Sequence, residues 1–331
     1  MSIKNVVIIG GGTGTFVTLS ALKNYPVKLK AIVSMIDSGG STGRLRDQLG
    51  VLPPGDVRQA LVALSDESKI WRDLFTYRFE NGDLNGHTFG NIFLSTIEKM
   101  AGSLPEAIKV SQKLLKTKGD ILPVTLDKST LYAKLSDGTV VEGEAKIDVL
   151  GEDWKSPVRK ISKCWISPKA YATKESLKAI EVADFIIIGP GDLHTSILPN
   201  FLVDGMARAI TKSTAKKIFV VNLMTKRGQT DGFKASNFIT ELKKISRGLV
   251  FDYILINNGK VEKSVVGWYK KTCEVGPVVN DLTENKRTKV IPSDTVGSTK
   301  YGKTISDRIQ RSLIRHDPEK LGKALIKIIL G

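Results

Sequence analysis

The residues best suited to chemistry stand in a glycine-rich turn near the start of the sequence. Residues 10–14 read GGGTG and follow residues 6–9, an apolar, mostly β-branched segment typical of a strand buried on both faces. Glycines at this point let the backbone turn tightly and present its N–H groups to a ligand. Because residues 16–22 are predicted to be helical, those N–H groups would lie at a helix N-terminus, where the dipole favours an anion. The turn predicts a phosphate-bearing ligand; the alternative is a tight strand-to-helix turn without one.

A second glycine-rich loop, SGGSTG at residues 38–43, follows the second predicted strand, residues 29–36. Asp37 stands between them and could hold a ribose hydroxyl, as in NAD-binding sheets. The first turn departs from the dinucleotide pattern G-x-G-x-x-G, because Thr15 occupies the third glycine position. Two glycine loops at adjacent strand ends favour a wider pocket for a phosphate-rich ligand over an NAD site.

Further polar loops are expected at the same edge of the sheet. GHTFGN at residues 86–91 begins a predicted helix, and its His87 and Asn91 would face a ligand. GPGD at 189–192 and NLMT at 222–225 each follow a predicted buried strand. Since the carboxyl ends of parallel strands meet at one edge, where ligands bind in open α/β sheets, these loops predict one shared site. No Ser-His-Asp arrangement accompanies His87, so no catalytic residue is assigned.

Charged residues at two helix starts have alternative roles. Asp56 is expected to cap a helix that begins near Val57. Arg58, in the first turn of that helix, is poorly placed for the dipole, which indicates either an external anion or an ordinary surface arginine. Near the end of the chain, Asp317 is expected to cap the last helix, and Arg315 could reach an anion.

Composition places the chain among ordinary globular proteins, with 41% apolar and 25% charged residues in 331. No apolar run approaches the roughly 18 residues of a membrane span, and the N-terminus lacks a signal-peptide pattern. Cys164 and Cys273 have no metal-binding spacing, so free thiols in a reducing cytosol are expected. These features predict a cytoplasmic protein.

The formal net charge of +16 is concentrated in the second half of the chain, where residues 151–331 carry 32 Lys and Arg against 18 Asp and Glu. Such a field could attract nucleic acid, anionic lipid or an anionic metabolite. The basic residues are dispersed rather than gathered in a long run. A solvated surface is therefore the favoured interpretation, and nucleic acid is a secondary alternative.

Alternation of predicted strands and helices indicates an α/β fold: a Rossmann-like, mostly parallel sheet with helices on both faces. Residues 121–149 change period, and Asp137-Gly138 is a strong hairpin signal between 131–135 and 139–143. We expect one domain over residues 1–331, with a small antiparallel β-hairpin insertion at 121–149. This insertion would shape a lid or an interface, and its sequence carries no evident chemistry.

Taken together, these segments resemble the bacterial gluconeogenesis-factor (YvcK-like) family, in the larger CofD-like group that includes 2-phospho-L-lactate transferase. The resemblance extends over nearly the whole chain in one order. The matching stretches are GGGTG (10–14), DSGGSTGRLR (37–46), PPGDVRQALVAL (53–64), YRFENGDLNGHTFGN (77–91), LPVT (122–125), GPGDLHTSILPNFLV (189–203), NLMTKRGQTDGF (222–233) and RHDP (315–318).

This resemblance implies a cytosolic protein linked to carbon metabolism, cell-wall precursor supply and cell shape, which binds a nucleotide sugar of the UDP-N-acetylglucosamine type. It implies regulation through a protein partner, in a chain that could be a homodimer. The alternative is an Mg²⁺-dependent enzyme that, like the transferase relatives, joins a phospholactyl group to the deazaflavin precursor of coenzyme F420.

Carried over residue by residue and joined with the loops above, the ligand-binding positions would be Gly11, Gly12, Thr13, Gly14, Asp37, Gly39, Gly40, Arg44, Asp56, Arg58, His87, Asn91, Gly189, Gly191, Asp192, Thr195, Asn222, Thr225 and Arg315. If a metal binds, Asp37 is the expected ligand. Family members usually have a second aspartate where Ser38 stands and a small hydroxyl residue where Asp192 stands. One carboxylate holds Mg²⁺ less well than two, so we hypothesise that Asp192 supplies the compensating acid.

Overall fold

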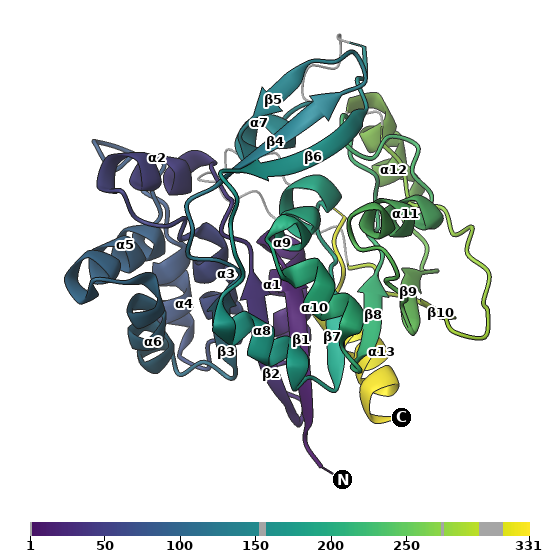
Figure 1. Ribbon diagram of the computed structural model, residues 1–331, viewed down its shortest axis with the longest axis horizontal. Helices are drawn as coiled ribbons and strands as arrows, with labels where there is room; N and C mark the ends of the chain where they lie inside the picture. The colour runs from purple at the N-terminus through teal and green to yellow at the C-terminus, as the bar shows by residue number, and fades with distance from the viewer. Residues whose placement is uncertain (1, 152–156, 273–274, 298–313) are drawn as a thin grey trace.

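The computed structural model describes residues 2–151, 157–272, 275–297 and 314–331, without the side chains of 268–272. Within these residues, seven strands form one parallel sheet in the order β10-β9-β8-β7-β1-β2-β3 (Figure 1). The strands are β1 (Lys4–Gly10), β2 (Val27–Val33), β3 (Asp120–Pro123), β7 (Phe185–Ile188), β8 (Lys216–Val220), β9 (Tyr253–Asn257) and β10 (Lys289–Ser293).

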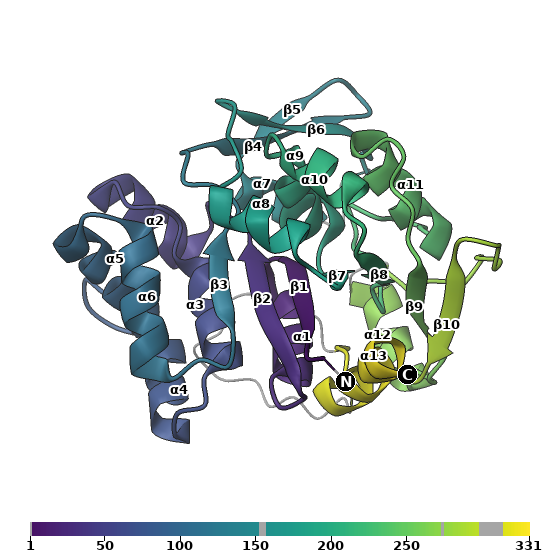
Figure 2. The same ribbon diagram turned by 60° about the horizontal axis from the view of Figure 1, so that its bottom comes forward.

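Helices cover both faces of this sheet, as the sequence predicts (Figure 2). On one face α1 packs against α3 and α13, and on the other α8, α9, α10 and α11 are packed side by side. The helices are α1 (Gly12–Leu22), α2 (Gly40–Leu49), α3 (Gly55–Leu64), α4 (Lys69–Thr76), α5 (Phe89–Ala101), α6 (Leu104–Leu115), α7 (Glu144–Asp148), α8 (Lys174–Glu181), α9 (Leu198–Leu202), α10 (Met206–Lys212), α11 (Ala235–Ile245), α12 (Lys263–Thr272) and α13 (Pro318–Leu330), with a π-helical turn, η1 (Leu193–Ile197).

The central strands are apolar because both of their faces are covered. Val6, Val7, Ile8 and Ile9 of β1 have at most 1% of their surface exposed, and they pair in register with β2 on one side and β7 on the other. Strand β10 was not predicted from the sequence. It lies at the edge of the sheet, where Lys289, Pro292 and Ser293 are tolerated, so it lacks the apolar run of a central strand.

A second, antiparallel sheet lies across the carboxyl ends of the parallel strands, at the top of Figure 1. It has the order β5-β4-β6, with β4 (Thr130–Leu135), β5 (Val140–Glu142) and β6 (Ile161–Ser167). The hairpin forms around Asp137-Gly138, but the boundaries differ from 121–149. Residues 120–123 pair with β2 in the main sheet, and β6 supplies a third strand from later in the chain.

The small sheet is held to the main body by a hydrophobic cluster of its own. Leu131, Ala133 and Ile147 pack with Ile36, which follows β2. Helix α7 therefore sits between the antiparallel sheet and the ends of the parallel strands. The insertion, which was expected to carry no chemistry, therefore places α7 at the edge of the sheet where the site is expected.

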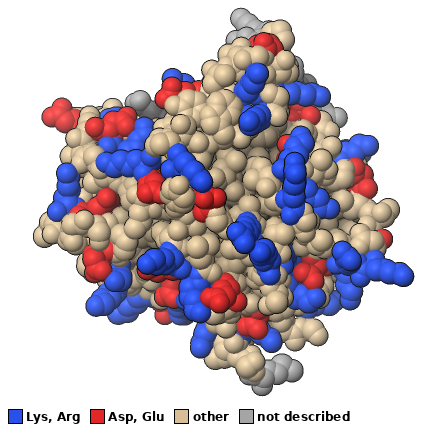
Figure 3. Space-filling view, in the orientation of Figure 1, with Lys and Arg blue, Asp and Glu red and all other residues tan. Residues whose placement is uncertain are grey.

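Basic and acidic side chains are interspersed on the face shown in Figure 3, without a continuous basic stripe. Among the described residues, no helix has the length and apolar character needed to cross a membrane.

Candidate functional site

The order of the strands reverses between β1 and β7, because the chain first builds β2 and β3 on one side and later β7 to β10 on the other. In open α/β sheets such a switch point opens a crevice at the carboxyl ends of the strands. The loops after β1 and β7 meet here closely. A side chain at Gly14 would clash with the Pro190 carbonyl oxygen, and a Cβ atom at Gly191 would lie 3.6 Å from the Gly11 carbonyl oxygen.

Helix α1 begins inside the first glycine turn, at Gly12, whose φ of +63° suits glycine. Its N-cap, Gly11, makes no side-chain capping bond, and its first turn holds no acidic residue. The Gly12 N–H instead donates to Asp56 Oδ1 of α3 at 2.8 Å. The prediction that Asp56 caps α3 is therefore wrong: Pro54 occupies the N-cap, and the Asp56 carboxyl is drawn to the start of α1.

The second glycine loop lies beside the first. Helix α2 begins at Gly40 with Gly39 as N-cap, again without a side-chain cap. The Gly39 N–H donates to Asp37 Oδ1 at 2.8 Å. Gly55 at the start of α3 approaches the Asp37 carboxyl so closely that a Cβ atom there would overlap it. The N-termini of α1, α2 and α3 thus meet around two carboxyl groups.

These two carboxyl groups are crowded by protein atoms and by each other. Burial, and then the charge of Asp37, raise the pKa of Asp56 to about 7, whereas Arg58 acts in the opposite direction. Burial also raises the pKa of Asp37, against hydrogen bonds from Gly39 and Thr42. Both side chains keep some solvent exposure. At neutral pH the Asp56 carboxyl can therefore serve as a hydrogen-bond donor or acceptor, and the Asp37 carboxyl offers an acceptor, for a ligand that enters from solvent.

Helix α7 completes this cluster from above, and sequence reasoning missed it. The Ala145 N–H donates to Ser38 Oγ at 3.2 Å, which fixes the start of α7 on the second glycine loop. Burial, followed by the charges of Asp37, Asp148 and Asp56, raises the pKa of Glu144 well above its usual range. The only signal in the sequence is the pair of acids at i and i+4, Glu144 and Asp148, directly after the hairpin.

Lys226, which follows β8, joins α7 to the loop after β7. Its Nζ atom lies 2.5 Å from Asp148 Oδ1 and 2.7 Å from Asp192 Oδ2. The Thr195 hydroxyl donates to the same Asp148 oxygen at 3.2 Å. The two neighbouring carboxylates raise the pKa of Lys226 despite its burial. Asp192 is thus paired with a lysine, and the hypothesis that it compensates for Ser38 stays a prediction.

The GHTFGN loop contacts the second glycine loop through Ser41. Ser41 Oγ lies 3.1 Å from His87 Nδ1, and Asn91 Nδ2 donates to the same hydroxyl at 3.1 Å. Arg44 reaches from α2 to donate to the Asn85 carbonyl at 2.5 Å. Burial, then the charges of Arg44 and Arg78, lower the pKa of His87, so this imidazole is neutral at pH 7. Asn91 Oδ1 is buried without a hydrogen-bond partner among the described residues.

Other predicted site residues hold the backbone of neighbouring loops. Asn222 bonds with both ends of its amide to Gly191, donating to the carbonyl at 2.8 Å and accepting from the N–H at 3.3 Å. The Thr225 hydroxyl donates to the Gly276 carbonyl at 3.2 Å. The Arg315 carbonyl accepts from the Gly297 N–H at 2.9 Å, after β10. Asp317 caps α13 as predicted, by accepting from the Lys320 N–H at 2.9 Å.

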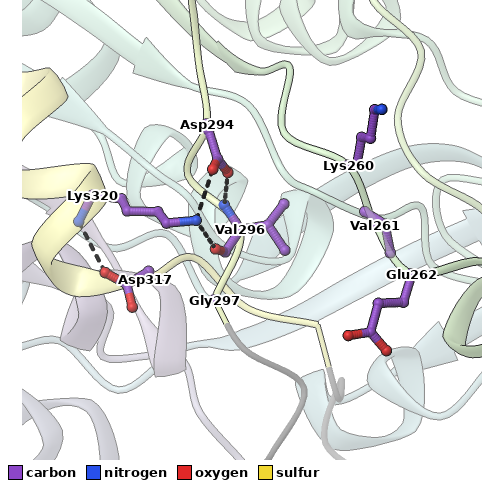
Figure 4. Close-up of a pocket in the computed structure, with 8 residues that line it drawn as sticks. All are labelled: Lys260, Val261, Glu262, Asp294, Val296, Gly297, Asp317 and Lys320. Carbon is purple, nitrogen blue, oxygen red and sulfur yellow. Dashed lines mark hydrogen bonds and ion pairs between the residues drawn. The ribbon is translucent and has the colours of Figure 1, made fainter.

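A cavity of about 330 Å³ lies at the carboxyl ends of β9 and β10, on the same edge of the sheet as the glycine loops (Figure 4). Its walls include Lys260, Glu262 and the Asp294–Lys320 ion pair, with 2.7 Å between Oδ2 and Nζ. None of the predicted site residues lines it. In the part of the chain that the structure describes, no three His, Cys, Asp or Glu side chains are grouped to hold a metal ion.

The sheet, its switch point and the converging glycine loops define a Rossmann-like α/β protein. The model of the family 2-phospho-L-lactate transferase CofD matches residues 6–296. The gluconeogenesis factor of Halalkalibacterium halodurans is 39% identical over 332 residues, covering 99% of this chain and 97% of that protein. The gluconeogenesis factor of Bacillus subtilis is 35% identical over 329 residues and covers 98% of each chain.

A solved structure of similar fold comes from Bacillus halodurans and is described as a member of the UPF0052 family. It has a TM-score of 0.86 and 36% identity, covering 98% of this chain and 100% of that chain. The chain therefore belongs to the gluconeogenesis-factor family, with a CofD-like domain, and the resemblance drawn from its motifs is confirmed.

Proposed function

We propose that the crevice between β1 and β7 binds a nucleotide sugar of the UDP-N-acetylglucosamine type, and that the protein regulates carbon metabolism and cell-wall precursor supply, and with them cell shape, through a protein partner in the cytoplasm. The observation that carries this proposal is the convergence of the glycine loops after β1, β2 and β7 at one switch point. A nucleotide diphosphate needs such a concentration of backbone N–H groups.

The starts of α1 and α2 supply those groups. Neither N-cap residue has a capping side chain and neither first turn holds an acidic residue. Asp56 accepts from the Gly12 N–H, and the N–H groups of Thr13, Gly14 and Ser41 are left for an anion. Asp37, Asp56 and the buried Asn91 Oδ1 offer hydrogen-bonding groups of the kind that ribose, sugar and base require. We assign no turnover to this arrangement.

Isothermal titration with UDP-N-acetylglucosamine, UDP and NAD tests the proposal. We expect the UDP-sugar to bind and NAD not to bind. Arg44→Ala should weaken UDP-sugar binding by about 10-fold or more, because a hydrogen bond to a charged group contributes roughly 1.5–3 kcal/mol. Arg46→Ala is the matched control, since Arg46 lies on the same helix and pairs with Asp47 at 2.9 Å. Absence of UDP-sugar binding to the unchanged protein would refute the proposal.

The match to the transferase family model favours a second candidate, an Mg²⁺-dependent phospholactyl-type transferase. The same titration with and without Mg²⁺, followed by an assay for diphosphate-bond cleavage with a deazaflavin acceptor, separates the two. Cleavage that depends on Mg²⁺ would favour the transferase, whereas binding without cleavage favours the regulatory protein.

A further inference from the structure

A groove of about 440 Å³ lies between α9, α10 and the C-terminal end of α11, away from the glycine loops. These helices belong to the layer at the front of Figure 1. None of the predicted site residues lines the groove. The groove is therefore separate from the proposed nucleotide site.

The base of the groove is apolar. Phe201 of α9 is 2% exposed, and Ala207 of α10 and the half-buried Ile245 of α11 stand beside it. Two hydroxyl groups lie among these side chains, Thr211 Oγ1 and Ser246 Oγ, which are buried without a hydrogen-bond partner among the described residues. Buried hydroxyl groups nearly always find a partner, so hydrogen-bonding capacity is left unused at this base.

The rim of the groove is basic, and its positive charges have no acidic partner among the described residues. Arg208, Lys212 and Arg247 are exposed, and among the described residues none of them makes an ion pair. The one acid of the groove, Asp204, is already paired with Lys169 at 3.0 Å. Lys212 is the last residue of α10, where the dipole favours a cation, and Arg247 follows two residues after the end of α11. Arg208 lies in the first turn of α10, which holds no acidic residue.

An apolar base within a basic rim is complementary to an acidic segment that carries an apolar side chain. We propose that this groove is the docking site for such a segment of a partner protein, with the apolar side chain against Ala207 and Ile245 and the carboxylates on Arg208, Lys212 and Arg247. A protein segment fits better than a small anion, because a small anion has no apolar side chain to place on the base. The inference rests on the regulatory part of the proposed function and supplies the surface through which it acts.

Site-specific photocrosslinking in cells of the native host tests this inference. Benzoylphenylalanine is placed at position 204, at the rim. Replacing Asp204 removes only its surface ion pair with Lys169, which contributes little to stability. We expect it to crosslink to one partner segment, and mass spectrometry should show that segment to be rich in Asp and Glu around an apolar residue. A benzoylphenylalanine at the exposed Lys113 of α6 is the position control.

Charge reversal then tests the basic rim. The triple variant Arg208→Glu, Lys212→Glu and Arg247→Glu should lower the crosslink yield at least 10-fold. A control triple with the same change in net charge reverses exposed lysines outside the groove: Lys174→Glu, Lys243→Glu and Lys286→Glu. This control should leave the yield unchanged.

Several results would overturn the inference: no crosslink above that from position 113, a crosslinked segment that is not acidic, a nucleic-acid or lipid adduct, or equal yields from the two triple variants. Titration of both triples with UDP-N-acetylglucosamine keeps the two proposals apart. Retained nucleotide binding with failed crosslinking would refute only the docking site. Failed nucleotide binding in the unchanged protein, with the acidic crosslink present, would refute only the nucleotide site.

Discussion

Asp56 belongs to α3 but bonds to the start of α1, and this contact gives its carboxyl group an unusual titration. Its pKa is raised to about 7, mainly by burial and by the neighbouring Asp37. In an unfolded chain an aspartate titrates near 3.9. Between about pH 4 and pH 7 the folded protein therefore holds a proton that the unfolded chain has lost, and stability falls as pH rises through this window.

We expect the free energy of unfolding to be lower at pH 8 than at pH 5. Asp56 lowers it by up to ~1.4 kcal/mol for each pH unit between pH 5 and its folded pKa of about 7. Asp56→Asn should reduce this loss, because the amide oxygen can still accept from Gly12 and carries no charge. Urea titrations at both pH values measure the effect, with Asp73→Asn on the exposed surface as control. An Asp56→Asn protein with the same pH dependence as the unchanged chain would contradict the assignment.

Single residues also mark what sequence reasoning could and could not reach. Gly14, Asp37 and Asn91 were predicted at the site because glycine turns and polar loops after strands are local patterns. Glu144 and Lys226 were missed because their roles depend on how the antiparallel sheet packs against the ends of the parallel strands. No local sequence pattern encodes that packing. The Asp56 cap was wrong for the same reason, since a partner 44 residues away competes for its carboxyl.

At the scale of elements, α7 and the antiparallel sheet are attached to the strand ends through a set of polar contacts. Lys226 bridges Asp148 of α7 and Asp192 of the loop after β7, and Ser38 holds the start of α7. The three charged side chains are each about a third exposed, so solvent screens the bridge. Lys226 thus joins three segments of the site.

Replacement of this lysine should loosen the small sheet before it unfolds the protein. We expect Lys226→Met to cost about 1–2 kcal/mol, less than fully buried charged hydrogen bonds contribute. Hydrogen exchange measured by mass spectrometry should increase in residues 130–148 and 161–167. Lys109→Met, which removes an exposed pair with Glu106, serves as control and should leave exchange there unchanged. Unaltered exchange in Lys226→Met would show that the bridge does not hold the sheet.

At the scale of the whole molecule, the parallel sheet, its helical layers and the one-edge placement of the loops followed from the sequence, since buried strands of Val and Ile alternate with amphipathic helices. The edge strand β10 was not predicted, and although residues 161–166 were expected to form a strand, their place as the third strand of the small sheet was not. Both depend on pairing with strands far away in sequence, and their own composition is mixed.

The close contact between the loops after β1 and β7 at the switch point can be tested at Gly14. Its Cα hydrogen faces the Pro190 carbonyl, so Gly14→Ala should cost about 1–3 kcal/mol or more by overpacking and should also weaken nucleotide binding. Thermal unfolding measures the first effect and titration the second. Gly267→Ala in α12 meets no atom within 4 Å and should be neutral or slightly stabilising. Equal melting temperatures for both variants would argue against the close approach.

The interior position of β1 in the sheet has a consequence for synthesis on the ribosome. β1 is the first strand made, yet its partner β7 begins 175 residues after β1 ends, at Phe185. Until then the peptide groups of Val6 to Ile9 have a hydrogen-bonding partner in β2 only, so a strand with a fully apolar centre is an open edge on the nascent chain. A fragment that stops before β7 would keep that edge, and its natural fate is self-association rather than a stable half-domain.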